Sequence, residues 1–112
     1  MFTAKARRVG MITIIDCRGR LVMGEPALEL STVIHRELRE GWKKFAINMG
    51  GVDYIDGAGL QEIVNAFQTV EGRRGQLKIF DLNEELKDSI QMTELNKPIL
   101  FQTEEDAVAS FS

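Results

Sequence analysis

Residues 52–60, VDYIDGAGL, connect a short apolar run to the clearest helical pattern in the chain. After this segment, apolar residues recur every three or four positions and polar residues fill the gaps between them. The apolar stripe consists of Leu60, Ile63, Val64, Phe67 and Val70. This spacing is that of a helix with one buried face. The segment therefore predicts a strand that ends at Asp56 and passes directly into a helix, with only small residues at the junction.

The rest of the chain shows the same alternation of strands and helices. Apolar, β-branched runs predict strands at 11–17, 44–49, 52–55, 76–82 and 98–101, and residues 2–9 are expected to pair with the first of them through a turn at Gly10. Residues 19–27 are expected to form a loop, and Gly50 and Gly51 to interrupt the sheet before residue 52. Such alternation implies an α/β fold with a mixed, mostly parallel sheet. We expect one domain over residues 1–112, with four to five strands and about four helices.

Short polar side chains mark three of the four predicted helix starts. Asp56 is expected to accept a hydrogen bond from the backbone N–H of Ala58 or Gly59, and Asn83 and Thr103 hold the equivalent position in the last two helices. Pro26 suits the first turn of the first helix, where its missing N–H costs nothing. In that helix the spacing turns one set of residues to the core, Ala27, Leu30, Ile34 and Leu38, and another to solvent, Glu29, Arg36, Glu37 and Arg39.

Charge and composition narrow the classes of function. The formal net charge of −3 lacks the basic excess of a nucleic-acid-binding protein, and the small basic clusters, such as Lys5, Arg7 and Arg8, are interpreted as solvated surface. Apolar runs are too short for a membrane span or a signal peptide, so we expect a cytoplasmic protein. Cys17 is the only cysteine, which excludes an intrachain disulfide and suggests a partly buried structural thiol.

Catalytic and metal-binding patterns are weak. His35 is the only histidine, and its neighbours four positions away, Ser31 and Arg39, do not complete a metal site. The Gly57–Gly59 segment lacks the Gly-Lys-Ser/Thr of a phosphate-binding P-loop. A helix cap explains Asp56 more simply than acid–base catalysis does. We therefore predict no catalytic residue, no metal and no cofactor.

The predicted start of the helix at Asp56 allows two interpretations. Its unpaired N–H groups and positive dipole end could receive a carboxylate or a phosphate. Alternatively, the small residues Gly57, Ala58 and Gly59 only let the helix pack close to the sheet. The residues by themselves leave both open.

Together, the order of elements and the segment VDYIDGAGL resemble the STAS domain family (sulfate transporter and anti-sigma factor antagonist). The resemblance covers nearly the whole chain, including CRGRLVMGEPALEL, KKFAINMGGVDYIDGAGLQEIVNAF, GQLKIFDLNEELKDSIQMTELNKPILF and TEEDAVASF. In that family an aliphatic residue and Asp are followed by Ser, then Ser, Thr or Ala, then Gly-Leu. Ile55, Asp56, Gly59 and Leu60 match this motif.

The resemblance implies a regulatory module that binds an anti-sigma factor, usually a serine kinase, and that is switched by phosphorylation of a hydroxyl residue in the motif. Here those hydroxyl positions are Gly57 and Ala58, and Ala58 is the phosphoacceptor-equivalent position. A second departure is Val22, where many antagonists carry Asp. The residues expected to bind the partner are Leu21, Val22, Met23, Gly24, Glu25, Asp56, Gly57, Ala58, Gly59 and Leu60.

Other roles stay open within the same family. The chain could serve as a subunit or scaffold of a lipid-transport or sensory assembly, or as a domain that binds an anionic ligand. A homodimer through exposed Trp42 or Phe2 is a further alternative.

Overall fold

The computed structural model describes residues 1–93, 95 and 99–111. Strands and helices alternate along this part of the chain after an initial pair of strands. The elements are β1 (Phe2–Val9), β2 (Ile12–Leu21), α1 (Glu25–Arg39), β3 (Lys44–Ile55), α2 (Gly57–Gly72), β4 (Gln76–Phe80), α3 (Glu84–Gln91), β5 (Leu100–Phe101) and α4 (Glu104–Ala109).

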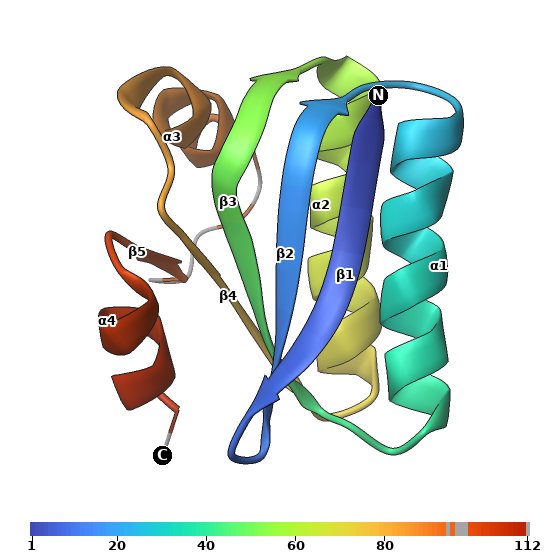
Figure 1. The fold of residues 1–112 in the computed structure, drawn as a ribbon, viewed down its shortest axis with the longest axis vertical. Coiled ribbons are helices and arrows are strands. Elements are labelled where there is room, and N and C mark those ends of the chain that lie inside the picture. Colours follow the sequence, from blue (N-terminus) through green and yellow to red (C-terminus); the bar gives the residue numbers. More distant parts are fainter. Residues whose placement is uncertain (94, 96–98, 112) are drawn as a thin grey trace.

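The five strands form one sheet in the order β1-β2-β3-β4-β5. Only β1 runs antiparallel to its neighbour, and the other pairs are parallel. Helices α1 and α2 lie side by side on one face of the sheet, whereas α4 covers part of the opposite face beside β4 and β5 (Figure 1). The predicted α/β fold with a mixed, mostly parallel sheet is confirmed.

Two apolar clusters hold these layers together. The larger one lies between the sheet and helices α1, α2 and α3, and includes Ile15, Phe45, Ile47 and Ile79 at full burial. The smaller one lies under α4, where Ala107 packs against residues of β2, β3 and β4. The predicted stripes of α1 and α2 contribute to the larger cluster, although Ala27 of α1 and Val64 of α2 are only partly buried.

The predicted helix caps are confirmed. Asp56, Asn83 and Thr103 each accept a hydrogen bond from the backbone N–H three residues later. Pro26 lies in the first turn of α1. The turn at Gly10 is also present, with a positive φ of 60°.

The sheet extends further than the glycine pattern predicted. Strand β2 continues through Gly19 to Leu21, so the predicted loop is shorter, and β3 runs without interruption through Gly50 and Gly51. The glycines allow an irregularity between β2 and β3 instead of ending a strand. A Cβ atom on Gly51 would lie 2.9 Å from the carbonyl oxygen of Cys17, so only glycine fits this close approach.

Four side chains lie elsewhere than predicted. Glu37 is buried and pairs with Arg8 of β1, and Phe2, 7% exposed, belongs to the core. Trp42 is partly buried beneath the Arg8 guanidinium, whose carbon lies 4.0 Å from the ring centre, so neither Phe2 nor Trp42 offers an exposed contact for a homodimer. Cys17 is fully in the core instead of partly buried. Pro98, the first residue of the last predicted strand, lies outside the described residues.

Candidate functional site

The predicted partner-binding residues meet where β2 and β3 end and α2 begins. Residues 21–25 comprise the last residue of β2, the loop 22–24 and the first residue of α1, and residues 56–60 form the first turn of α2 and its cap. Because β2 and β3 are parallel neighbours, with Leu21 paired to Ile55, their carboxyl ends lie together. We call residues 21–25 and 56–60 together the α2-start surface.

Asp56 joins the two segments of this surface through its side chain. One carboxylate oxygen, Oδ1, accepts a hydrogen bond from Gly59 N at 2.8 Å and caps α2. The other, Oδ2, accepts one from Met23 N at 3.1 Å in the β2–α1 loop. The Asp56 backbone N–H also donates to the Leu21 carbonyl oxygen at 3.3 Å. A single residue therefore fixes the relative position of the loop and the helix start.

These hydrogen bonds also set the charge of Asp56. The backbone N–H groups of Gly59 and then of Met23 favour the ionised carboxylate, and they hold the pKa of Asp56 below its usual range. The α2-start surface therefore carries a negative charge at neutral pH, placed on the positive end of the helix dipole.

Gly59 brings α2 into direct contact with β2. A Cβ atom at this position would lie 2.1 Å from the Leu21 carbonyl oxygen and 2.8 Å from Cγ1 of Ile55. The interpretation that the small residues permit close packing thus holds for Gly59. It does not hold for Gly57, where a Cβ atom would meet nothing within 4 Å.

The predicted residues differ in what they expose. Leu21 and Gly59 are buried and support the surface from beneath, while Asp56, Ala58, Leu60 and Val22 are partly buried. Met23, Gly24, Glu25 and Gly57 are exposed, and Met23 is 75% exposed. An exposed methionine offers an adaptable apolar contact.

Sequence reasoning missed Arg20 and Tyr54 as neighbours of this surface. Tyr54 is 47% exposed two residues before Asp56, and the Arg20 guanidinium carbon lies 4.8 Å from the centre of its ring. The predicted loop at 19–27 concealed this pairing, because Arg20 is in fact a strand residue opposite Tyr54. The sequence does contain a signal for this contact, because Tyr54 stands directly before the motif and aromatic residues are enriched in protein interfaces.

Two other candidates have structural explanations. His35 is exposed on α1, and its Nδ1 lies 2.8 Å from the Ser31 carbonyl oxygen. Cys17 is buried, which raises the pKa of its thiol to about 12. Such a thiol stays protonated at neutral pH, so Cys17 packs as a small apolar residue.

Comparison with known proteins places this geometry in a family. The family model that matches is the STAS domain, over residues 3–107. No curated protein matches the sequence at a significant level. In the described part of the chain, no helix has the length and apolar character to cross a bilayer.

Solved structures share the fold at low sequence identity. A Thermotoga maritima protein proposed to be an anti-sigma factor antagonist has a TM-score of 0.84 at 21% identity, covering 95% of this chain and 92% of that chain. An anti-sigma factor antagonist from Mycobacterium paratuberculosis has a TM-score of 0.83 at 18% identity, covering 97% and 92%. The Bacillus cell fate determinant SpoIIAA, in its phosphorylated form, has a TM-score of 0.77 at 16% identity, covering 96% and 97%.

Proposed function

The chain belongs to the STAS domain family, and from this premise we propose that it is a non-enzymatic regulator that binds an anti-sigma factor of the serine-kinase type. The α2-start surface is the proposed docking site. One observation carries this assignment: Asp56 holds the β2–α1 loop and the first turn of α2 together, with Gly59 N at 2.8 Å and Met23 N at 3.1 Å.

The exposed part of this surface has the properties of a protein contact. Met23 presents an apolar side chain, and Gly57 exposes its backbone because it has no side chain. Tyr54 adds an aromatic ring with a polar hydroxyl group at the edge of the surface. A free anionic ligand is a less suitable occupant of the helix start, because the Asp56 carboxylate already accepts the Gly59 N–H and would repel a second negative group.

We further propose that this docking site lacks a phosphorylation switch. SpoIIAA is known in a phosphorylated form, and a phosphate adds about −1.5 to −2 charges at neutral pH. At the equivalent positions this chain has Gly57 and Ala58, neither of which carries a hydroxyl group. The partner would therefore bind irrespective of kinase activity toward this loop.

Affinity capture tests the docking site. The immobilised full chain is expected to retain an anti-sigma factor kinase from a lysate of the source cells, identified by mass spectrometry. Asp56→Ala should reduce the captured amount, because the loop and the helix start lose their common anchor. Ala58→Glu should reduce it more, because it places a new charge in the contact.

A matched control separates these effects from general damage. Ala109→Glu adds the same charge at an exposed position of α4, on the opposite face of the sheet, and should capture as well as the wild type. Equal capture by Ala58→Glu and the wild type would place the interface elsewhere. Recovery of transport or sensory subunits in place of a kinase would assign the chain to one of those assemblies.

A further inference from the structure

A hollow of about 470 Å³ lies on the sheet face opposite α1 and α2, and it shares no residue with the α2-start surface. The side chains that matter there are contributed by three adjacent strands: Thr3 and Lys5 of β1, Asp16 and Arg18 of β2, and Asn48 of β3. Its volume lies in the range of small-ligand sites. This region is the part of that face that α4 leaves uncovered (Figure 1).

Strand register brings two cations to the hollow. In the antiparallel pair, Thr3 is opposite Arg18 and Lys5 is opposite Asp16, so Lys5 and Arg18 are diagonal neighbours on one face. Within the described residues, neither Lys5 nor Arg18 forms an ion pair. Both are exposed, and their charges are available to a ligand.

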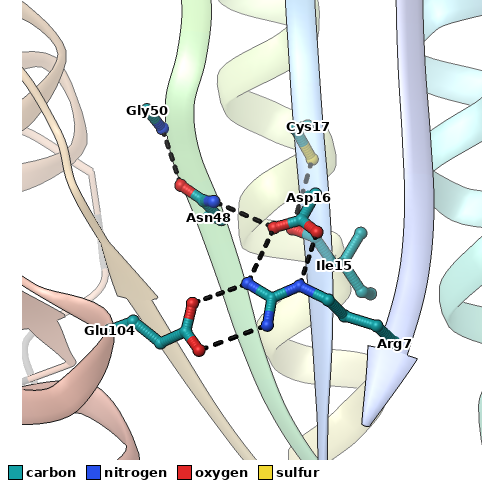
Figure 2. A network of polar contacts seen from close by, with 7 residues as sticks. All are labelled: Arg7, Ile15, Asp16, Cys17, Asn48, Gly50 and Glu104. Atoms are coloured by element: carbon teal, nitrogen blue, oxygen red, sulfur yellow. Dashed lines mark hydrogen bonds and ion pairs between the residues drawn. The ribbon is translucent and has the colours of Figure 1, made fainter.

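Among the described residues, Asp16 is the one carboxylate that lines the hollow, and its oxygens already accept hydrogen bonds. Asp16 accepts hydrogen bonds from Arg7 Nε at 2.7 Å and from Arg7 Nη2 at 3.2 Å, and Asn48 Nδ2 donates to it at 2.9 Å (Figure 2). Figure 2 shows Arg7 lying between Asp16 and Glu104, whose carboxylate it also binds, at 2.6 and 3.2 Å. Arg7 shares its charge between Asp16 and Glu104, so the Asp16 carboxylate is partly compensated, and the two positive charges of Lys5 and Arg18 outnumber it in the lining.

The backbone leaves room for a ligand between these side chains. Gly51 lies beside Arg18 in the parallel pair and contributes no side chain to the hollow. The irregular pairing between Asp16 and Arg18 in β2 shifts Arg18 relative to β3 at the same place. Glycine here is required by the close approach to Cys17, and the open floor is a consequence of it.

From this arrangement we propose that the hollow binds a phosphate group, carried either by a soluble phosphate ester or by a lipid headgroup. The Arg18 guanidinium and the Lys5 ammonium would contact the phosphate oxygens, and the Thr3 hydroxyl would donate a further hydrogen bond. Arg pairs with phosphate in a two-pronged geometry and Lys acts as a point charge, so the two are complementary. Arg7 and Asn48 are positioning residues, because their hydrogen bonds fix the orientation of the Asp16 carboxylate.

Amide NMR of the full chain tests the site with three probes: inorganic phosphate, glycerol 3-phosphate, and vesicles containing phosphatidylglycerol compared with phosphatidylcholine alone. Shifts are expected at residues 3–5 and 16–18. Lys5→Gln and Arg18→Gln should each weaken binding roughly tenfold, the loss of one charge-assisted contact. Arg18→Lys, which keeps the charge, should weaken it less. Arg39→Gln removes an exposed cation from the end of α1 and should leave binding unchanged.

The outcomes separate the site from its alternatives. Binding to phosphatidylglycerol vesicles alone, lost in Lys5→Gln and Arg18→Gln, supports the site and makes a lipid headgroup the source of the phosphate. Binding of the soluble probes supports a free ester. The proposal is overturned by the absence of shifts with all three probes, by shifts centred on residues 56–60, or by equal binding in the folded Lys5→Gln, Arg18→Gln and Arg39→Gln variants. None of these results depends on the anti-sigma factor proposal.

Discussion

Two small residues in the first turn of α2 have opposite structural roles. Gly59 is buried against the carbonyl oxygen of Leu21, so its lack of a side chain sets the distance between α2 and β2. Gly57 faces open space, so its lack of a side chain leaves the surface bare. The motif therefore combines a packing requirement at Gly59 with an exposed position, Gly57, in the proposed docking surface, and substitution can separate the two.

Gly59→Ala is predicted to destabilise the fold. The added methyl would meet backbone and a branched side chain, which cannot yield easily, and overpacking of this kind costs about 1–3 kcal/mol. Urea unfolding measures the loss. Gly57→Ala is the matched control, and it should be neutral or stabilising by about 0.5 kcal/mol through a lower entropy of the unfolded chain. Equal stability of the two variants would show that the close contact with Leu21 is absent.

Cys17 is predicted to react slowly with thiol reagents in the folded protein. Its pKa is raised to about 12, chiefly by burial, so the reactive thiolate is scarce at pH 8 and becomes abundant only far above it. Labelling with an aromatic disulfide reagent at pH 8 should be slow in buffer and fast in denaturing urea. Rapid, complete labelling in buffer would mean that β2 opens readily at this position.

At the scale of elements, β1 and α1 are connected by charged side chains that local patterns do not reveal. The Glu29 carboxylate accepts a hydrogen bond from Ala4 N at 2.8 Å, which covers part of the free edge of β1. Near the other end of α1, Arg8 Nη2 lies 2.5 Å from Oε1 of buried Glu37, as a close ion pair without hydrogen-bond geometry. The edge strand is thereby attached to the helix at two points.

Arg8→Ala is predicted to weaken this attachment by about 2 kcal/mol, because it leaves the buried Glu37 carboxylate without its main partner. The value lies below that for a fully buried pair, since Arg8 still reaches solvent. Thermal or urea unfolding of Arg8→Ala and the wild type measures this loss of stability. Adding Glu37→Leu to Arg8→Ala should recover part of the loss, whereas Arg39→Ala should stay within about 0.5 kcal/mol of the wild type. A double variant no more stable than Arg8→Ala would disprove the role of the buried charge.

At the scale of the whole molecule, the sequence predicts the alternation of elements and the helix caps correctly, because both depend on nearby residues. Asp56, Asn83 and Thr103 are examples. Local rules fail where distant strands decide the outcome. Gly50 and Gly51 resemble a strand break by local rules, yet β3 continues through both, and Gly51 pairs with Arg18 of β2.

Local rules predict one part of the candidate site, whereas the other part depends on the pairing of distant strands. The Asp56–Gly59 contact follows from local capping rules, whereas the Asp56–Met23 contact spans 33 residues and needs the parallel pairing of β2 and β3. Burial of Glu37 likewise depends on where β1 packs on α1. Hydrophobic periodicity predicts that Glu37 faces solvent. Its burial is tolerated because Arg8 of β1 pairs with Oε1 and Arg36 Nε donates to Oε2 at 3.4 Å.

Retention of an anti-sigma factor kinase on the immobilised protein, with and without ATP, tests the central claim most directly. The central claim is that the α2-start surface binds the kinase and carries no hydroxyl group that the kinase could phosphorylate. The wild type is predicted to retain the kinase in both conditions. Ala58→Ser should retain it only without ATP, because transfer of the γ-phosphoryl group to the introduced hydroxyl would place about two negative charges on the α2-start surface. Release of the kinase from the wild type upon addition of ATP, or its retention by phosphorylated Ala58→Ser protein, would contradict the claim.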